Sequence, residues 1–187
     1  MTALMNSAAR ISQRLEQLDW LVPTLARFLF AAVLFVYFIN AGLTKVGDGL
    51  FGIFQPSAGA YAQIFPKAFE AAGYDTSALG MFHYLVVASG TIAEFILPVL
   101  IVIGLMTRLA ALGMIGFIVV QSLTDIYGHG QTAEIGGWFD RFPDAILLDQ
   151  RAMWVFLLIV LVIKGAGPLS FDRALFRRAP SGTNAAL

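Results

Sequence analysis

The segment from Leu79 to Arg108, LGMFHYLVVASGTIAEFILPVLIVIGLMTR, constrains the fold of this chain more than any other stretch. It is long and apolar enough to cross a bilayer as a helix, since about 20 such residues span the hydrocarbon core. Its middle carries one carboxylate, Glu94. A charged side chain at this depth costs ~2.5–3.5 kcal/mol on insertion scales. The sequence therefore predicts that neighbouring helices supply a partner for Glu94, or that its carboxyl group stays protonated.

The composition of the whole chain is typical of a membrane protein. Of its 187 residues, 58% are hydrophobic and 13% are charged, whereas soluble domains carry roughly 25% charged residues. The net charge is zero, so no bulk electrostatic attraction favours nucleic acid as a partner. The chain contains no cysteine, which excludes disulfides, thiolate nucleophiles and cysteine-held iron–sulfur clusters within it.

Four long apolar runs predict an all-α fold, namely a polytopic membrane four-helix bundle. The expected spans cover about 21–44, 80–105, 109–126 and 145–164, and together they form one transmembrane domain over 21–166. The short connection between the second and third spans makes them an antiparallel hairpin. Residues 1–20 have an amphipathic pattern that predicts an N-terminal interfacial helix. Residues 167–187 are expected to form a partly disordered tail.

The loops and the basic residues predict the orientation of the bundle. Two long loops, residues 46–78 and 127–144, leave the spans on the same side. Lys and Arg are more frequent in the flanks on the other side, where both termini lie. The positive-inside rule therefore predicts cytoplasmic termini and two long outer loops, with the lipid bilayer around the four spans.

The residues near Glu94 favour a special environment for its carboxyl group. Gly90, Glu94 and Pro98 follow one another at i, i+4 and i+8 and so lie close to one helix face. Pro98 has no N–H to donate to the carbonyl of Glu94, which leaves a free backbone acceptor there. Two interpretations remain open: a buried proton or ligand site, or a glutamate whose hydrogen bonds only fix helix packing.

The first span supplies the candidate partners for Glu94. Asn40 and Tyr37 share a helix face at a similar depth and rank first. Arg27 ranks second, because it could reach toward Glu94 from the cytoplasmic side if the two helices are adjacent. Lys45 ranks third, because it lies further out and its stem would have to bend inward.

A second polar group is expected at the outer ends of the second and third spans. Gln121 and Asp125 share a helix face, His129 begins the loop, and His83 lies at the same level on the second span. These residues could form a polar vestibule or a quinone-headgroup pocket, or they are solvated helix ends. His83, His129 and Asp125 also suggest a divalent metal site, although no close pair such as H-x-x-x-H supports it. A bis-histidine haem is favoured even less.

Four motifs together resemble those of the DoxX family. Arg27 followed by AGLTK at 41–45 is similar to the pattern of its first span, and Glu94 matches the acidic position of its second span. GLMTR at 104–108 resembles the family's G-L-x-T-R hairpin, and KGAGPLSFD at 164–172 resembles its exit motif. The resemblance identifies four family positions without giving them a role: Lys45, Glu94, Arg108 and Asp172.

The resemblance implies a small four-helix protein of the bacterial inner membrane. Some family members are subunits of a thiosulfate:quinone oxidoreductase, and others are associated with redox or oxidative-stress systems. This suggests an accessory or anchor subunit of a quinone-linked redox or stress-response system, with quinone as the cofactor to consider. Its protein partner would come from a redox or metal-handling system. Because this chain has no cysteine or cofactor ligand set, we expect it not to be catalytic by itself.

Two other functions remain open from the sequence. The first is a small-solute or proton-coupled permease that uses the buried Glu94 beside Pro98. The second is a purely structural membrane partner, in which Glu94 contributes only to stability. A homo-oligomer is compatible with each of the three functions.

Overall fold

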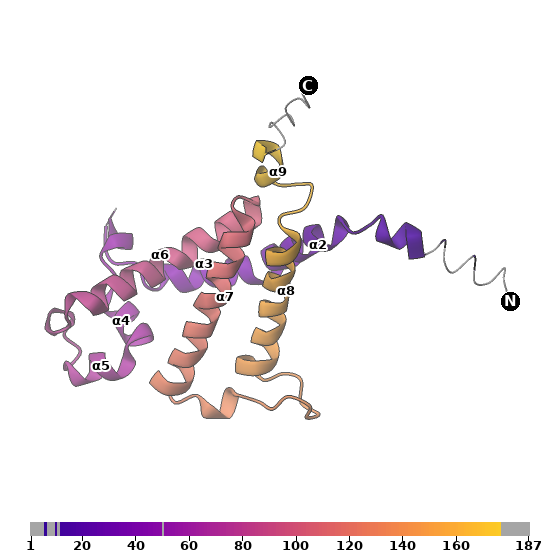
Figure 1. The fold of residues 1–187 in the computed structure, drawn as a ribbon. Helices are drawn as coiled ribbons and strands as arrows, with labels where there is room; N and C mark the ends of the chain where they lie inside the picture. Colours follow the sequence, from indigo (N-terminus) through magenta and orange to yellow (C-terminus); the bar gives the residue numbers. More distant parts are fainter. Residues whose placement is uncertain (1–5, 7–9, 11, 50, 177–187) are drawn as a thin grey trace, which may run out of the picture.

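The computed structural model describes residues 6, 10, 12–49 and 51–176, and these residues form helices and loops without a strand (Figure 1). Four helical segments are long and apolar enough to cross a membrane: Leu21–Leu43, Met81–Ile103, Thr107–Gly128 and Ile146–Lys164. The all-α class with four membrane-spanning helices is therefore confirmed. The third segment begins earlier and ends later than expected, because Asp172 binds its first backbone N–H groups and a π-helical turn extends its end.

Each spanning segment is built from one or more helical elements. The first consists of α2 (Leu21–Leu29), the π-helical η1 (Phe30–Phe35) and α3 (Val36–Leu43). The second is α6 (Met81–Ile103), which continues through Pro98. The third is α7 (Thr107–Leu123), extended by η4 (Thr124–Gly128). The fourth begins with η6 (Ile146–Gln150) and continues as α8 (Arg151–Lys164).

Short elements occupy the connections between the spans. The first loop holds η2 (Gly52–Phe54), α4 (Ala58–Ile64), α5 (Pro66–Ala71) and η3 (Thr76–Ala78). The second loop holds η5 (Thr132–Glu134), and α9 (Phe171–Phe176) follows the last span. Residues 12–16 of the expected interfacial helix are helical. Residues 1–5, 7–9 and 11 of that helix and 177–187 of the expected tail lie outside the described residues.

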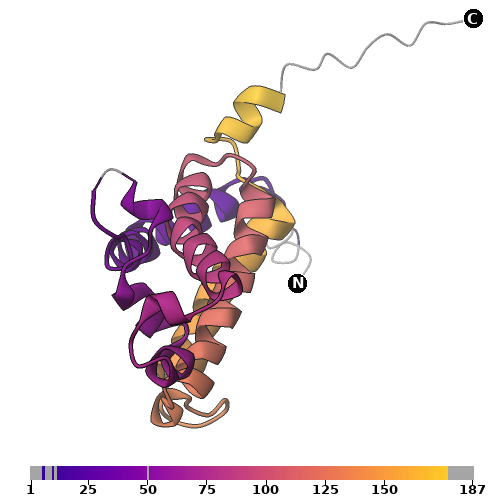
Figure 2. The same ribbon diagram turned by 90° about the vertical axis from the view of Figure 1, so that its left-hand side faces the viewer.

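The four spans pack around one apolar core. α7 contacts both α6 and α8, while the first span divides its contacts, with α2 against α8 and α3 against α6 (Figures 1 and 2). Fully buried side chains from all four spans meet there, including those of Phe30, Phe38, Ile101, Met114 and Leu158. In a bilayer such contacts stabilise the bundle by van der Waals packing, since lipid tails are as apolar as the core.

The two ends of the bundle differ in structure. At one end, called here the loop end, α4 packs against α6 and α5 packs against α4 (Figure 1). Tyr61 and Phe69 are buried against Val87 of α6, which fixes both short helices on the bundle. The opposite end, called the termini end, holds the α6–α7 turn and α9.

At the termini end, the Arg27 side chain joins three segments of the chain. Its Nε donates to the Ile101 carbonyl at 3.0 Å, and Nη2 donates to the Val102 carbonyl. Its Nη1 donates to the carbonyls of Ala166, at 2.9 Å, and Leu169. The carbonyls in the last turn of a helix need such partners. Arg27, expected as the second-ranked partner of Glu94, instead binds the end of α6, so that expectation is wrong.

Asp172 closes the α6–α7 turn from the other side. Its carboxylate accepts hydrogen bonds from the backbone N–H of Met106 at 2.7 Å and of Thr107 at 3.0 Å. A carboxylate at this position satisfies the free N–H groups of α7 and complements the helix dipole. Gly104 ends α6 with φ of +73°, and a Cβ there would lie 2.6 Å from the Ser170 Cβ, so the turn requires glycine.

We expect Arg27→Lys to lower the free energy of unfolding by about 1–3 kcal/mol, the cost of leaving partly buried carbonyl acceptors without a donor. A lysine ammonium cannot reproduce the planar fork that reaches carbonyls of α6 and of the segment after α8. The measurement is equilibrium unfolding in detergent, with the exposed Arg173→Lys as the matched control. An Arg27→Lys protein as stable as the control would contradict this role.

Candidate functional site

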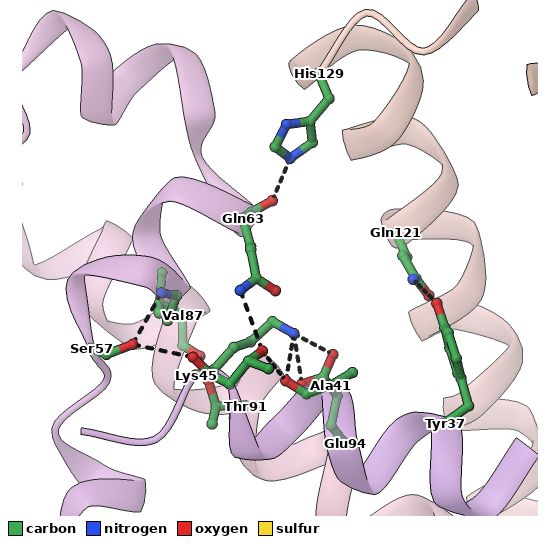
Figure 3. A network of polar contacts seen from close by, with 12 residues as sticks. Tyr37, Ala41, Lys45, Ser57, Gln63, Val87, Thr91, Glu94, Gln121 and His129 are labelled. Carbon is green, nitrogen blue, oxygen red and sulfur yellow. Dashed lines mark hydrogen bonds and ion pairs between the residues drawn. The ribbon is translucent and has the colours of Figure 1, made fainter. Parts of the chain in front are cut away.

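An ion pair joins Glu94, within the second span, to Lys45, which lies just after the first span (Figure 3). The Lys45 Nζ is 2.9 Å from Glu94 Oε1 and 3.0 Å from Oε2, and it donates to the Ala41 carbonyl at 3.0 Å. The two residues are only 6% and 3% exposed. A buried pair of this kind stabilises a fold when both charges are hydrogen-bonded, whereas removing one partner is costly. The predicted partner for Glu94 is therefore present in the structure.

The close crossing of α3 and α6 explains why Lys45 is that partner. A Cβ at Gly42 would lie 2.8 Å from the Phe95 ring, so glycine allows this contact. The Lys45 stem bends back by one helical turn to Ala41, which brings its Nζ to the depth of Glu94. The sequence-based ranking, which placed Lys45 third, was wrong because it underestimated the reach of this stem.

The first-ranked candidates, Tyr37 and Asn40, lie elsewhere. The Tyr37 hydroxyl accepts a hydrogen bond from Gln121 Nε2 at 3.0 Å (Figure 3). The Tyr37 ring packs against Trp154. Asn40 is exposed. Tyr37 thus connects α3 with α7 and α8, whereas Asn40 faces outward. The ranking that placed these two residues first as partners of the Glu94 carboxylate is therefore wrong.

A cavity of about 570 Å³ adjoins the ion pair. This volume is within the range of small-molecule sites. Its walls come from α6 between Val86 and Leu97 and from α7 with its extension η4 between Gly113 and Asp125, and α4 closes it with Gln63 and Ile64. Lys45 and Glu94 lie on its wall, and most of the remaining lining is apolar. The cavity therefore combines an apolar wall at membrane depth with a buried charge pair.

Small residues keep this cavity open. A Cβ at Gly116 would meet nothing within 4 Å, and one at Gly90 would meet only Ile64 Cδ1 at 3.5 Å. Ser89 and Gly116, on facing helices, are both exposed, so the cavity also opens sideways between α6 and α7. Gly113, three residues earlier on α7, lies at a closer approach of the two helices, since a Cβ there would lie 3.2 Å from Leu97 Cδ2, whereas Gly116 faces the open space.

Three of the four residues expected in the outer polar cluster line the loop end of the cavity: Gln121, Asp125 and His129. His83 does not line it, because its ring packs against Phe65 and Phe82. Among the described residues, no group of three or more His, Asp or Glu side chains is placed to hold a metal ion. The metal site suggested by His83, His129 and Asp125 is therefore not formed in the described part of the chain.

Two further residues of the site were missed from the sequence. Arg151, buried at the start of α8, pairs with Asp125 at 2.5 Å and donates to Ser122 at 2.8 Å. Gln63 of α4 accepts a hydrogen bond from His129 Nε2 through its backbone carbonyl at 2.9 Å, and its side chain donates to Thr44 at 3.3 Å (Figure 3). The sequence offers one sign that Arg151 is buried and paired, namely its position directly before an apolar run within the fourth span.

Lys45 and Glu94 both lie in the part of the chain that matches a known family. The DoxX family model matches residues 22–125, which is more than half of the chain. The chain belongs to the DoxX family. No curated protein and no solved structure matches it. Of the expected DoxX positions, Lys45 and Glu94 form the buried pair, whereas Asp172 caps α7 at the termini end and Arg108 is exposed there.

Proposed function

We propose that this DoxX protein is an accessory subunit of a quinone-linked redox system, and that its cavity binds the quinone. The observation that carries the proposal is the cavity of about 570 Å³ that joins an apolar wall to the Lys45–Glu94 pair at membrane depth. A quinone has a planar polar ring and an apolar tail, so it suits a site with one polar corner and a lateral opening to lipid.

The shape of the cavity supports access from the bilayer. Ser89 and Gly116 border the opening between α6 and α7, and neither would obstruct a flat ring. Polar side chains at the loop end, including Gln121 and His129, provide groups that can orient the ring. Of the polar groups on the cavity wall, Glu94 lies furthest from the loop end, where a change in the ring's charge or hydrogen bonding would be felt most strongly.

The same proposal includes the surroundings of the protein. The bilayer is the bacterial inner membrane, the termini end faces the cytoplasm and the loop end faces outward, as the distribution of Lys and Arg indicates. The electrons come from a partner protein, because this chain supplies no thiolate ligand for an iron–sulfur cluster. We propose that the chain anchors this partner and holds the quinone for it.

A permease is favoured less by this arrangement. A path across the membrane would have to continue beyond Glu94, where Ile101, Ala110 and Met114 are buried in the apolar core. The cavity is bounded on that side by Leu97 and Gly113, about six residues before the end of each helix, or roughly 9 Å of packed protein.

The test is to purify the protein from its own membranes, with any co-purifying partners, and to quantify the extracted quinone. We expect quinone with the wild-type protein and much less with Glu94→Gln, alongside slower electron transfer to quinone. Lys67→Gln, an exposed change on α5, is the control. If the protein binds no quinone, alone or with partners, and Glu94→Gln leaves electron transfer unchanged, the proposal is wrong.

A further inference from the structure

The hydrogen-bond donors beside the ion pair are already in use. A lysine ammonium has three N–H groups, and Lys45 directs its Nζ at both carboxylate oxygens of Glu94 and at the Ala41 carbonyl (Figure 3). The hydroxyl of Ser89, also on the cavity wall, donates to the Val86 carbonyl at 3.1 Å. A ligand that reaches this corner therefore meets no free donor from either side chain.

Acceptors, in contrast, remain free on the wall of the same cavity. A carboxylate has about four lone-pair sites, and the described contacts of the Glu94 carboxylate come from Lys45 alone. Gln121, on the facing helix, donates through Nε2 to Tyr37, and its Oε1 is buried without a partner among the described residues. An unsatisfied buried acceptor is costly, and a ligand that donates to it removes this cost.

We infer that the cavity selects the reduced, dihydroxy form of the ring, the quinol, over the oxidised quinone. This inference rests on the proposed function and names the redox state of its ligand. A quinol carries two O–H donors, whereas a quinone carries two carbonyl acceptors. The free acceptors of Glu94 and Gln121 complement the O–H groups of the quinol, whereas a quinone carbonyl beside Glu94 would bring an acceptor toward a carboxylate.

The preference has a direct consequence for the redox partner. A site that binds quinol more tightly than quinone raises the reduction potential of the bound couple, because it stabilises the reduced form. The quinone is thus easier to reduce in this cavity than in the surrounding lipid. This direction suits a partner that delivers electrons to quinone, and no covalent step by this chain is required.

The test compares three short-tailed benzoquinone ligands on the whole protein in lipid nanodiscs under anaerobic conditions. They are the quinone, its quinol and the quinol's dimethyl ether, which has the same ring without O–H groups. We expect the quinol to bind about tenfold more tightly than the other two, since a site built for a hydroxyl rejects analogues that lack it. Equal affinities, or tighter binding of the quinone, would overturn the inference and leave the proposed function standing.

Two variants assign the preference to its residues. Glu94→Gln replaces an acceptor with an amide that also donates, so the quinol preference should fall by about tenfold. Gln121→Leu removes the second acceptor without touching the ion pair, so it is informative even if Glu94→Gln fails to fold. It should weaken binding of the quinol relative to binding of the dimethyl ether. An unchanged ratio in Gln121→Leu and in a folded Glu94→Gln would overturn the inference. If none of the three rings binds the wild-type protein, the proposed function fails and the inference fails with it.

Discussion

Replacing Lys45 with methionine should lower the free energy of unfolding by about 3–5 kcal/mol, the usual cost of removing one partner from a buried ion pair. Methionine keeps much of the apolar stem but leaves the Glu94 carboxylate, only 3% exposed, without a counter-charge. The carboxylate must then remain as an isolated charge or take up a proton, and both responses cost free energy at membrane depth.

The double variant Lys45→Met with Glu94→Gln should recover most of that loss, since replacing both charges removes the unpaired one. The measurement is equilibrium unfolding in mixed detergent micelles, followed by helical circular dichroism. Lys67→Met is the matched control, because Lys67 is an exposed lysine on α5. A double variant whose loss equals the sum of the two single losses would show that the residues do not interact.

Gly116→Phe should weaken quinone or quinol binding by at least about tenfold while leaving the fold intact. A Cβ at this position meets nothing within 4 Å, so the ring projects into the cavity and occupies the space for the ligand. A glycine within a helix also costs stability relative to other residues, so the change is not expected to destabilise α7. Binding is measured by titrating a short-tailed quinol into nanodiscs.

The control for this substitution is Val119→Phe, on the same helix. Val119 is 49% exposed and does not line the cavity, so a larger ring there faces the bilayer. It should leave both affinity and stability close to wild type. Equal binding by Gly116→Phe and Val119→Phe would mean that the ligand binds outside the cavity between α6 and α7.

The features that could be predicted from the sequence are those with a local cause. Long apolar runs determine where helices can span a membrane, and the carboxylate inside one run predicts a buried partner. The identity of that partner depends on how two helices cross. The crossing of α3 and α6 depends on the packing of Gly42 against Phe95, and the ion pair depends on the bend of the Lys45 stem. Spacing along the chain shows neither feature, so it could not rank Lys45 first.

The cavity could not be predicted for a related reason. Its volume depends on how far α6 and α7 separate toward the loop end, which the short turn between them does not determine. Gly113 and Gly116 have the same side chain and differ by three positions, yet one contacts Leu97 and the other faces open space. The partners of Arg27 could not be predicted either, because the carbonyls that it binds belong to the end of α6 and to the segment after α8, which are far from Arg27 along the chain.

The most direct test of the central claim is to locate the bound ring with a photoreactive quinone. The whole protein in nanodiscs is irradiated with an azido-quinone, digested and analysed by mass spectrometry, with excess unlabelled quinol as competitor. The proposal predicts competable labelling on the cavity-lining residues within 86–97 of α6 and 113–121 of α7, such as Ala93, Phe117 and Val120, and loss of that labelling in Gly116→Phe. Labelling that competitor does not reduce, or that falls only on lipid-facing residues such as Val119, would contradict it.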